Sequence, residues 1–220
     1  MTDVDDRSII SPMARTPSRQ TIIEEGARIV HARGFRAAGL KEILDAAGVP
    51  KGSFYFHFKS KEDFGLALVD HFQSLIESAG EKLLGDQGTP PLERLARFMD
   101  AYENMFEKMG FSRGCPIGNL MQEMSDVSEA FRERVARAYE GMHAAIQAVL
   151  DEAKGLGQVA GHLDTEETAW FILDSWEGAI MHMKLAKSTR PLRICRRMVF
   201  ERILAGADAH ARKRGGKRHG

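Results

Sequence analysis

Residues 39–61, GLKEILDAAGVPKGSFYFHFKSK, decide the fold of this chain. Their first part places apolar side chains at helical spacing, so that a short helix would bury one face formed by Leu40, Ile43, Leu44 and Ala47. Gly48 supplies the backbone freedom that ends this helix, and Pro50 suits the first turn of a second one. Two short helices around a tight turn are the layout of a helix-turn-helix, whose second helix enters the major groove of DNA.

The same stretch, continued to residue 64, resembles a known DNA-reading element. Residues 46–64, AAGVPKGSFYFHFKSKEDF, are similar to the DNA-reading segment of the TetR family of bacterial repressors. The likeness lies in Ala46-Ala47-Gly48-Val49, Lys51-Gly52, the aromatic run at 54–58 and Lys59-Ser60-Lys61-Glu62. With a preceding helix expected at 18–33, it covers roughly a quarter of the chain. The resemblance implies an all-α fold, with an N-terminal three-helix DNA-binding head and a C-terminal helical domain for ligand binding and dimerisation.

The resemblance also implies which side chains contact DNA. Tyr55 and His57 are expected to donate to phosphates, and Lys61 to do so from the first turn of the next helix. The residues at the major-groove end of the recognition helix are Lys51, Gly52 and Ser53. Lys51 can pair with guanine O6 and N7, and the glycine beside it allows the backbone to approach closely.

The head departs from the family pattern at one phosphate contact, and part of its aromatic run is expected to serve the core instead of DNA. Family members often begin the first helix of the turn with a hydroxyl residue that meets a phosphate, whereas this chain has Ala38 and Gly39 there. Glycine still caps a helix weakly, and Lys41 or Arg36 is expected to replace the missing contact. Two aromatic residues of the run are expected to pack in the core of the head: Phe54 and Phe58.

Charge favours a DNA contact at this end of the chain through local asymmetry. The 31 basic and 31 acidic side chains of the 220 residues balance, so bulk charge supplies no attraction to nucleic acid. Residues 15–59, however, hold eight basic side chains against four acidic ones, a local excess of +4. A solvated charged face would account for this excess, but not for its coincidence with the turn motif.

The chain is expected to divide into four parts. These are a flexible arm at 1–17, the helix-turn-helix domain at 18–64, a helical effector-binding and dimerisation domain at 65–212, and a basic disordered tail at 213–220. The arm shows no periodicity, and the tail continues a basic run that is better explained as solvated than as a phosphate contact.

Glycine and proline divide the chain beyond the head into helical segments. Ser60 and Asp63 have capping-box spacing and open a long connector helix, expected at 61–84. Further helices are expected at 92–108, 117–124, 128–153, 165–187 and 191–212. The total is about nine helices, with no strand alternation and no repeat.

The last two helices carry apolar residues on more than one face, as helices of an interface do. Their stripes consist of Leu173, Trp176, Ile180 and Met183 on the first, and Leu192, Val199 and Ile203 on the second. TetR-like proteins dimerise through these helices, so the resemblance implies a homodimer on a palindromic operator, with recognition helices about 34–36 Å apart or a multiple of that spacing. Packing of both helices against the body of their own chain is the alternative.

One segment of the C-terminal domain indicates what it senses. Residues 111–120 and 122–124, together with 175–180 and 183–185, resemble the cysteine-containing branch of the family that includes acrylate-responsive and N-ethylmaleimide-responsive repressors. Pro116 suits the first position of a helix, which would place Cys115 at its N-terminus with Arg113 nearby, and both features stabilise a reactive thiolate. The resemblance adds Lys184 as a partner of this cysteine. A buried, unreactive cysteine is the alternative.

A reversible ligand would instead occupy a pocket among the body helices. Its expected lining is Phe106, Met109, Tyr139, Met142, His143, Trp176 and His182. Trp176 and Glu177 are the stronger candidates, because they lie in the segment 175–180 that resembles the cysteine-containing branch. His143 and His182 lack the spacing of a metal site, and neither a metal nor a cofactor is expected.

These features together indicate a cytoplasmic TetR-type repressor, not an enzyme, which a small molecule or electrophile releases from operator DNA. Two cysteines suit a reducing compartment, and no apolar run has the length of a membrane helix. The alternatives are a thiol enzyme using Cys115 with His143 or His182, and an architectural DNA-binding protein with no inducer.

Overall fold

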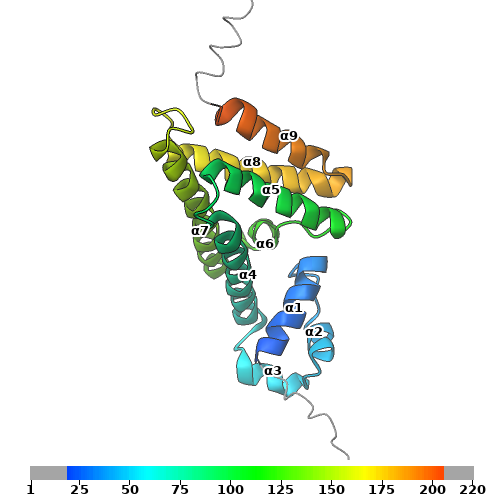
Figure 1. The fold of residues 1–220 in the computed structure, drawn as a ribbon. Coiled ribbons are helices and arrows are strands. Elements are labelled where there is room, and N and C mark those ends of the chain that lie inside the picture. The colour runs from blue at the N-terminus through cyan, green and yellow to red at the C-terminus, as the bar shows by residue number, and fades with distance from the viewer. Residues whose placement is uncertain (1–18, 206–220) are drawn as a thin grey trace, which may run out of the picture.

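The helix-turn-helix head closes around a cluster of aromatic rings. The computed structural model describes residues 19–205, and its head consists of α1 (Arg19–Arg33), α2 (Leu40–Ala47) and α3 (Lys51–His57), blue to cyan in Figure 1. Phe54 and Phe58 are buried, as predicted, with their ring centroids 5.3 Å apart. Phe64, the next aromatic residue, is buried 5.2 Å from Phe58. Three contacting rings give this small domain a core of its own.

The turn between α2 and α3 has the geometry that its sequence predicts. Gly48 adopts the left-handed conformation, with φ 66°, and ends α2. The N–H of Val49 then closes the turn on the carbonyl of Leu44 at 2.9 Å. Pro50 is extended and lies one position before α3 rather than inside its first turn. Gly39 caps α2 without a side-chain hydrogen bond, as expected.

The connector helix α4 (Lys61–Leu84) starts at a capping box, as predicted. Ser60 Oγ accepts the N–H of Asp63 at 3.0 Å, and the Asp63 carboxylate accepts the N–H of Lys59 at 2.9 Å. Satisfying these two backbone donors fixes where the helix begins, directly after the recognition helix. From there α4 runs into the body and packs beside α7 (Figure 1).

The body is built from the remaining helices, and the described range contains α-helices and no strand, which confirms the predicted all-α class. Its elements are α5 (Pro91–Lys108), α6 (Pro116–Met124), α7 (Glu129–Gly155), α8 (Thr165–Ala186), α9 (Arg190–Met198) and a π-helical turn at Val199–Ile203. Helices α5, α8 and α9 lie at the end away from the head (Figure 1). No helix within residues 19–205 has the length and apolarity needed to cross a membrane.

Several predicted features fall outside the described range. They are the arm at 1–17, the tail at 213–220 and the last part of the predicted final helix, residues 206–212. Within the described residues the predicted number of about nine helices is confirmed.

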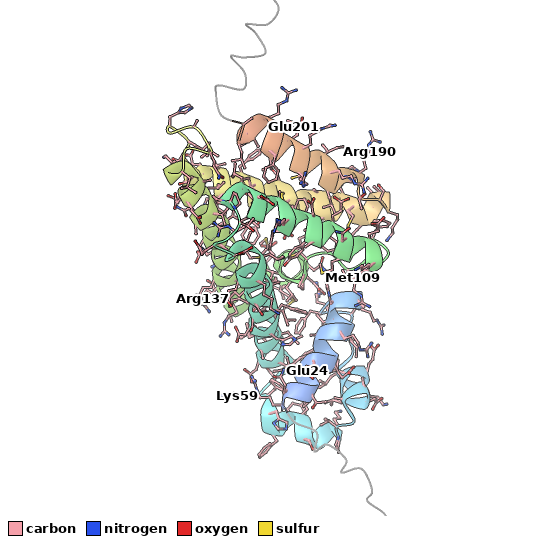
Figure 2. The ribbon with its side chains drawn as sticks, viewed as in Figure 1. Glu24, Lys59, Met109, Arg137, Arg190 and Glu201 are labelled. Atoms are coloured by element: carbon pink, nitrogen blue, oxygen red, sulfur yellow. The ribbon has the colours of Figure 1, made fainter. Side chains whose placement is uncertain are left out.

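The predicted interface stripes turn out to face the core of the same chain. Leu173, Trp176, Ile180 and Met183 on α8 are all at most 6 % exposed, and Leu192 and Val199 are at most 1 % exposed. These six residues are therefore unavailable to a partner, whereas Ile203, the last member of the predicted stripes, is half-buried. A second, exposed apolar face exists on the same helices, formed by Phe171, Met181, Leu185, Ile194 and Met198. Figure 2 shows how side chains project from the helices across the whole body.

Candidate DNA-binding surface and effector cavity

Helix α3 presents most of the predicted DNA-reading side chains to solvent. Lys51, Gly52 and Tyr55 are exposed, whereas Ser53 and His57 are half-buried. The buried positions 54 and 58 are one helical turn apart, which turns the residues between them outward. Phe56 is 88 % exposed on this outward face. No role was predicted for Phe56 from the sequence, although helical spacing alone separates it from the core positions 54 and 58.

Three basic side chains of the head are already neutralised. Arg28 pairs with Glu25 at 3.0 Å, Arg33 with Glu42 at 2.6 Å and Lys41 with Asp45 at 2.6 Å. Within residues 19–205, four exposed cations of the head have no ion-pair partner, and they are Arg19, Arg36, Lys51 and Lys59. These four carry the part of the local positive excess that no carboxylate of the head offsets.

Lys61, which was expected to contact a phosphate, has its ammonium group turned toward the protein. Its Nζ donates to the carbonyl of Ala38 at 2.7 Å and lies 5.0 Å from the centre of the Phe35 ring. Partial burial lowers the pKa of this ammonium, and the nearby Glu123 carboxylate opposes that shift. The contacts give Lys61 a structural role, because they hold the start of α4 against the end of the loop between α1 and α2.

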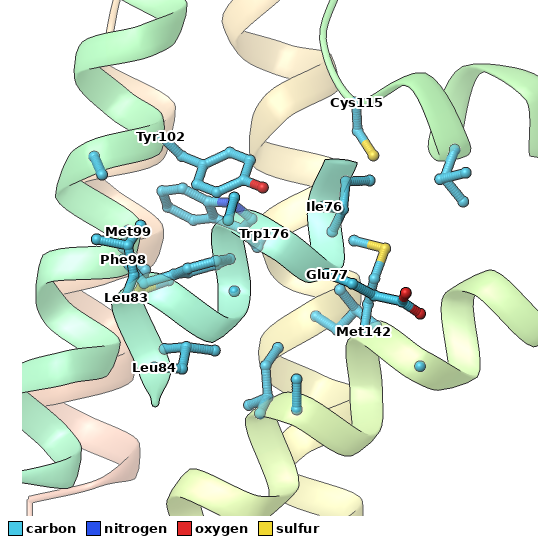
Figure 3. A pocket seen from close by; sticks show the side chains of 18 of the residues that line it. Ile76, Glu77, Leu83, Leu84, Phe98, Met99, Tyr102, Cys115, Met142 and Trp176 are labelled. Atoms are coloured by element: carbon cyan, nitrogen blue, oxygen red, sulfur yellow. The ribbon is translucent and has the colours of Figure 1, made fainter. Parts of the chain in front are cut away.

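A cavity of about 730 Å³ lies inside the body, between α4, α5, α7 and α8 and the start of α6. Its wall is mainly apolar and aromatic, and Figure 3 shows side chains that include Ile76, Phe98, Met99, Tyr102, Met142 and Trp176. A cavity of this size accommodates a ligand of several hundred daltons. Of the residues predicted to line it, Phe106, Met109, Met142 and Trp176 do so.

The other three predicted lining residues lie elsewhere. Tyr139 donates its hydroxyl to Asp174 at 2.8 Å, and His143 stacks on Trp170 with ring centroids 3.9 Å apart. His182 is exposed. Neither of these two histidines lines the cavity with Cys115, so the structure does not bring together the pairs Cys115–His143 or Cys115–His182. Among the described residues no group of side chains could hold a metal ion.

Cys115 occupies the predicted position at the N-terminus of α6. Its Sγ accepts the N–H of Gly118 at 3.5 Å, and it lines the cavity while being only 8 % exposed. Its electrostatic surroundings differ from those predicted. Burial raises the pKa of the thiol well above its usual value, and the adjacent Glu177 carboxyl raises it further, against the lowering effect of the amides of Gly118 and Ile117.

Glu177, in turn, is a mostly buried carboxyl whose pKa is raised by burial, while its hydrogen bond with the Cys115 thiol acts in the opposite direction. The charged group next to the sulfur is therefore acidic, and activation of Cys115 by Arg113 or Lys184 stays a prediction. In Figure 3, Cys115 lies at the edge of the cavity beyond Tyr102 and Trp176.

The two predicted cations lie behind this site, around Asn119. Lys184 donates to Asn119 Oδ1 at 3.3 Å, and Asn119 Nδ2 donates to the carbonyl of Arg113 at 2.7 Å. Arg113 has a left-handed backbone with φ 68° and an exposed side chain. Neither cation lines the cavity. Lys184 instead contacts Asn119, which holds the loop that leads into Cys115 through the backbone carbonyl of Arg113.

Two contacts that the sequence did not reveal connect this region with the head. His31 on α1 donates from Nε2 to the carbonyl of Gly114 at 2.7 Å, immediately before Cys115. Glu123 near the end of α6 accepts the backbone N–H groups of Phe35 and Arg36 at 2.8 and 2.6 Å. No local pattern marks these pairs, since their members lie more than 80 residues apart in the sequence.

Comparison with known proteins supplies relatives for both halves of the chain. Residues 22–68 match the profile of bacterial regulatory proteins of the tetR family, and residues 91–199 match the tetracyclin repressor-like C-terminal domain. The HTH-type transcriptional repressor DhaR of Mycobacterium sp. strain GP1 is 34 % identical over 196 residues, which are 89 % of this chain and 97 % of DhaR.

Two solved structures show the same fold. A TetR regulatory protein from Rhodobacter sphaeroides has a TM-score of 0.78 at 33 % identity, covering 83 % of this chain and 97 % of the other. Escherichia coli NemR in its reduced form has a TM-score of 0.77 at 28 % identity, covering 82 % and 94 %.

Proposed function

The chain belongs to the TetR family of bacterial transcriptional regulators and is a repressor of that type, and we propose that a small molecule in the body cavity releases it from operator DNA. The observation that supports this most strongly is the position of α6. One end of this short helix lines the 730 Å³ cavity at Cys115, and the other end holds the backbone of the head through Glu123. A ligand that favours one position of α6 would thereby favour one position of the head.

In the proposed DNA complex, α3 reads the operator. Lys51, Gly52 and Ser53 face base edges while Tyr55 and His57 bind phosphates, consistent with the exposure of this surface. Lys41 is exposed but paired with Asp45, so a phosphate must compete with that carboxylate. Lys61 would have to leave the Ala38 carbonyl to reach a phosphate.

Operator binding can be tested with duplexes selected from a random pool, using fluorescence anisotropy. Lys51→Ala is expected to weaken binding of the selected duplex by about 1–3 kcal/mol. Lys82→Ala, at an exposed lysine near the far end of α4, serves as the control and should leave affinity unchanged. Equal affinities for selected and random duplexes would contradict a repressor and support the architectural alternative.

We propose a homodimer formed through the exposed apolar face of α8 and α9. Leu185 is 82 % exposed there, and a two-fold axis through this face would place two α3 helices on the halves of a palindrome. Leu185→Glu is expected to yield a monomer in sedimentation and to lose operator binding. Leu156→Glu changes a leucine that is 63 % exposed at the end of α7 and should leave the dimer intact. A dimeric Leu185→Glu protein would place the interface elsewhere.

Electrophile sensing at Cys115 is the second candidate for the inducing event. It is supported by the position of this cysteine on the cavity wall and by the likeness to NemR. Operator affinity would be measured with and without acrylate or methylglyoxal, in the wild type and in Cys115→Ser. Release that persists in Cys115→Ser would exclude the cysteine mechanism and leave the repressor proposal standing.

The division into a head at 18–64 and a body at 65–212, and a cytoplasmic location, complete the proposal. The location follows from the need to reach chromosomal DNA and from two cysteines that are both free.

A further inference from the structure

The head contributes one side chain to the described wall of the body cavity, and it is His31 in the last turn of α1. This end of α1 points toward α6 in Figure 1. The imidazole donates from Nε2 to the carbonyl of Gly114 at 2.7 Å and lies edge-on to the ring of Phe72, with centroids 5.8 Å apart. Gly114 and Phe72 line the same cavity. A molecule at this end of the cavity would therefore touch the DNA-binding head itself.

The position of this hydrogen bond on the cavity wall distinguishes it from other contacts between the head and the body. Glu123 and Ser128 of the body also form hydrogen bonds with the head. Neither these two residues nor their partners line the cavity. The pair of His31 and Gly114 differs from them, because both of its members lie on the wall. An occupant can open this bond by direct contact, whereas it reaches the others only by moving a helix.

The loop that carries the acceptor is strained. Phe111 and Arg113, between α5 and α6, have left-handed backbones with φ 55° and 68°, which residues other than glycine rarely adopt. Such conformations persist where surrounding contacts hold them. Here Lys187 donates to the Phe111 carbonyl at 3.3 Å, Asn119 to the Arg113 carbonyl at 2.7 Å, and His31 to the carbonyl that follows. Withdrawing one of these donors would favour a relaxed form of the loop.

We propose that His31 is the positioning residue through which an occupant of the cavity acts on the head. An occupant beside Cys115 displaces the imidazole from the Gly114 carbonyl, the loop relaxes, and α1 loses its connection to the start of α6. The head then changes its orientation, and operator affinity falls. This inference rests on the proposed function, because it names the route by which the same cavity regulates operator binding.

The test measures the coupling between cavity and operator in the full-length protein, as the ratio of operator dissociation constants with and without a saturating occupant. The occupant is N-phenyl-1-naphthylamine, an apolar dye whose fluorescence reports its own binding. The pH is 7.5, so that His31, whose pKa burial lowers below the usual 6.5, is neutral. The ratio is expected to be about ten in the wild type.

Two variants at position 31 separate the hydrogen bond from the packing of the ring. His31→Leu removes the donor, so the ratio should fall to about one while dye affinity changes by less than about threefold. His31→Gln keeps an N–H donor for the Gly114 carbonyl and should restore most of the ratio. A wild-type ratio in His31→Leu would overturn the inference and leave α6 with Glu123 as the route, so that the proposed function stands.

Asp70→Asn is the matched control for a general loosening of the body. It breaks the ion pair of Asp70 on α4 with Arg134 on α7, whose atoms lie 2.6 Å apart, and neither residue lines the cavity. The ratio should stay at its wild-type value. A fall in Asp70→Asn equal to that in His31→Leu would overturn the specific role of His31. Circular dichroism at the assay temperature verifies that each variant is folded.

A second measurement follows His31 in the wild-type protein and does not depend on how His31→Leu folds. Histidine side chains are labelled with ¹⁵N, and the His31 signals are identified by their absence from His31→Gln. Saturating the cavity with the dye should shift the Nε2 signal, because its hydrogen bond to Gly114 opens. His31 signals that stay unchanged while the dye binds would overturn the inference.

Failure of the proposed function has a different signature. A dye that does not bind, or that binds without changing the operator affinity of the wild type, would contradict the cavity as the regulatory site. The role of His31 would then fail with it.

Discussion

The Glu123 carboxylate accepts the backbone N–H of Arg36 at 2.6 Å, across 87 residues of sequence. Its second oxygen accepts the N–H of Phe35 at 2.8 Å, so one side chain satisfies two consecutive amides at the end of the first head helix. Gly34, just before them, has φ 90°, and a Cβ there would lie 3.1 Å from the same carboxylate. The loop is therefore shaped to receive this carboxylate, and the body fixes the head at this point.

Glu123→Gln is expected to lower the free energy of unfolding by about 1–3 kcal/mol, because the amide keeps a single acceptor for two backbone donors. Urea denaturation followed by circular dichroism measures the change. Glu133→Gln, at an exposed glutamate of α7, is the matched control and should be near neutral. Similar stabilities of the two variants would mean that Glu123 does not secure the head.

The titration of His31 should make the free energy of unfolding depend on pH. Burial is the main cause that lowers its pKa below the usual 6.5, Arg113 and Lys184 lower it further, and the Gly114 carbonyl opposes them. The unfolded chain therefore binds a proton more readily than the folded one, and stability rises with pH between the folded and unfolded pKa values. We expect full stability above pH 6.5 and a decline as the pH falls below it.

The measurement is the denaturation midpoint between pH 5 and 8 for the wild type and His31→Gln. Glutamine retains an N–H donor for the Gly114 carbonyl but does not titrate, so the decline below pH 6.5 should be smaller in this variant. The same pH profile in both proteins would assign the decline to other groups.

The space around Gly65 on α4 is too small for any side chain. A methyl group there would lie 2.6 Å from the Phe35 ring and would also overlap Phe131, and both rings are buried. Gly65→Ala should therefore destabilise the protein by about 1–3 kcal/mol. Gly80 lies in the same helix with no atom near its missing Cβ, so Gly80→Ala should stabilise by up to about 1 kcal/mol. Thermal melts of the two variants that shift in the same direction would contradict this packing.

Cys115 is expected to react slowly with alkylating agents in the uninduced protein, because its thiol is buried and its pKa is raised. Glu177→Gln removes the adjacent carboxylate and should accelerate alkylation by iodoacetamide at pH 8 by about three- to tenfold. Peptide mass spectrometry measures the rate, and Cys195, whose pKa burial raises to about 11, is the internal control. Slower modification of Cys115 in Glu177→Gln would show that the carboxylate assists as a base.

The features that could be predicted from the sequence are those decided by neighbouring residues. The capping box of Ser60 and Asp63 and the left-handed Gly48 involve contacts over three or four positions, so side-chain type and spacing suffice to place them. Cys115 at the start of α6 belongs to the same class, since Pro116 fixes the first helical position.

The remaining features depend on how each helix is rotated against its neighbours. Met142 and His143 are adjacent on α7, yet one lines the cavity and the other stacks on Trp170, because successive residues point about 100° apart. The acidic neighbour of Cys115 comes from α8, 62 positions later, and no local pattern reveals which side chain of that helix will face it. Arg94 on α5 likewise joins α4 and α7, through the Leu84 carbonyl and Glu152.

The nine residues of α6 form a rod about 13 Å long, with the cavity at one tip and the head at the other. Inserting a single residue within it would swing Glu123 by about 100° and detach it from the Arg36 amide. The ligand specificity of such a protein can change through single substitutions of residues that line the cavity. The length of α6, in contrast, must stay the same, because it sets the distance and the rotation between the cavity and the head.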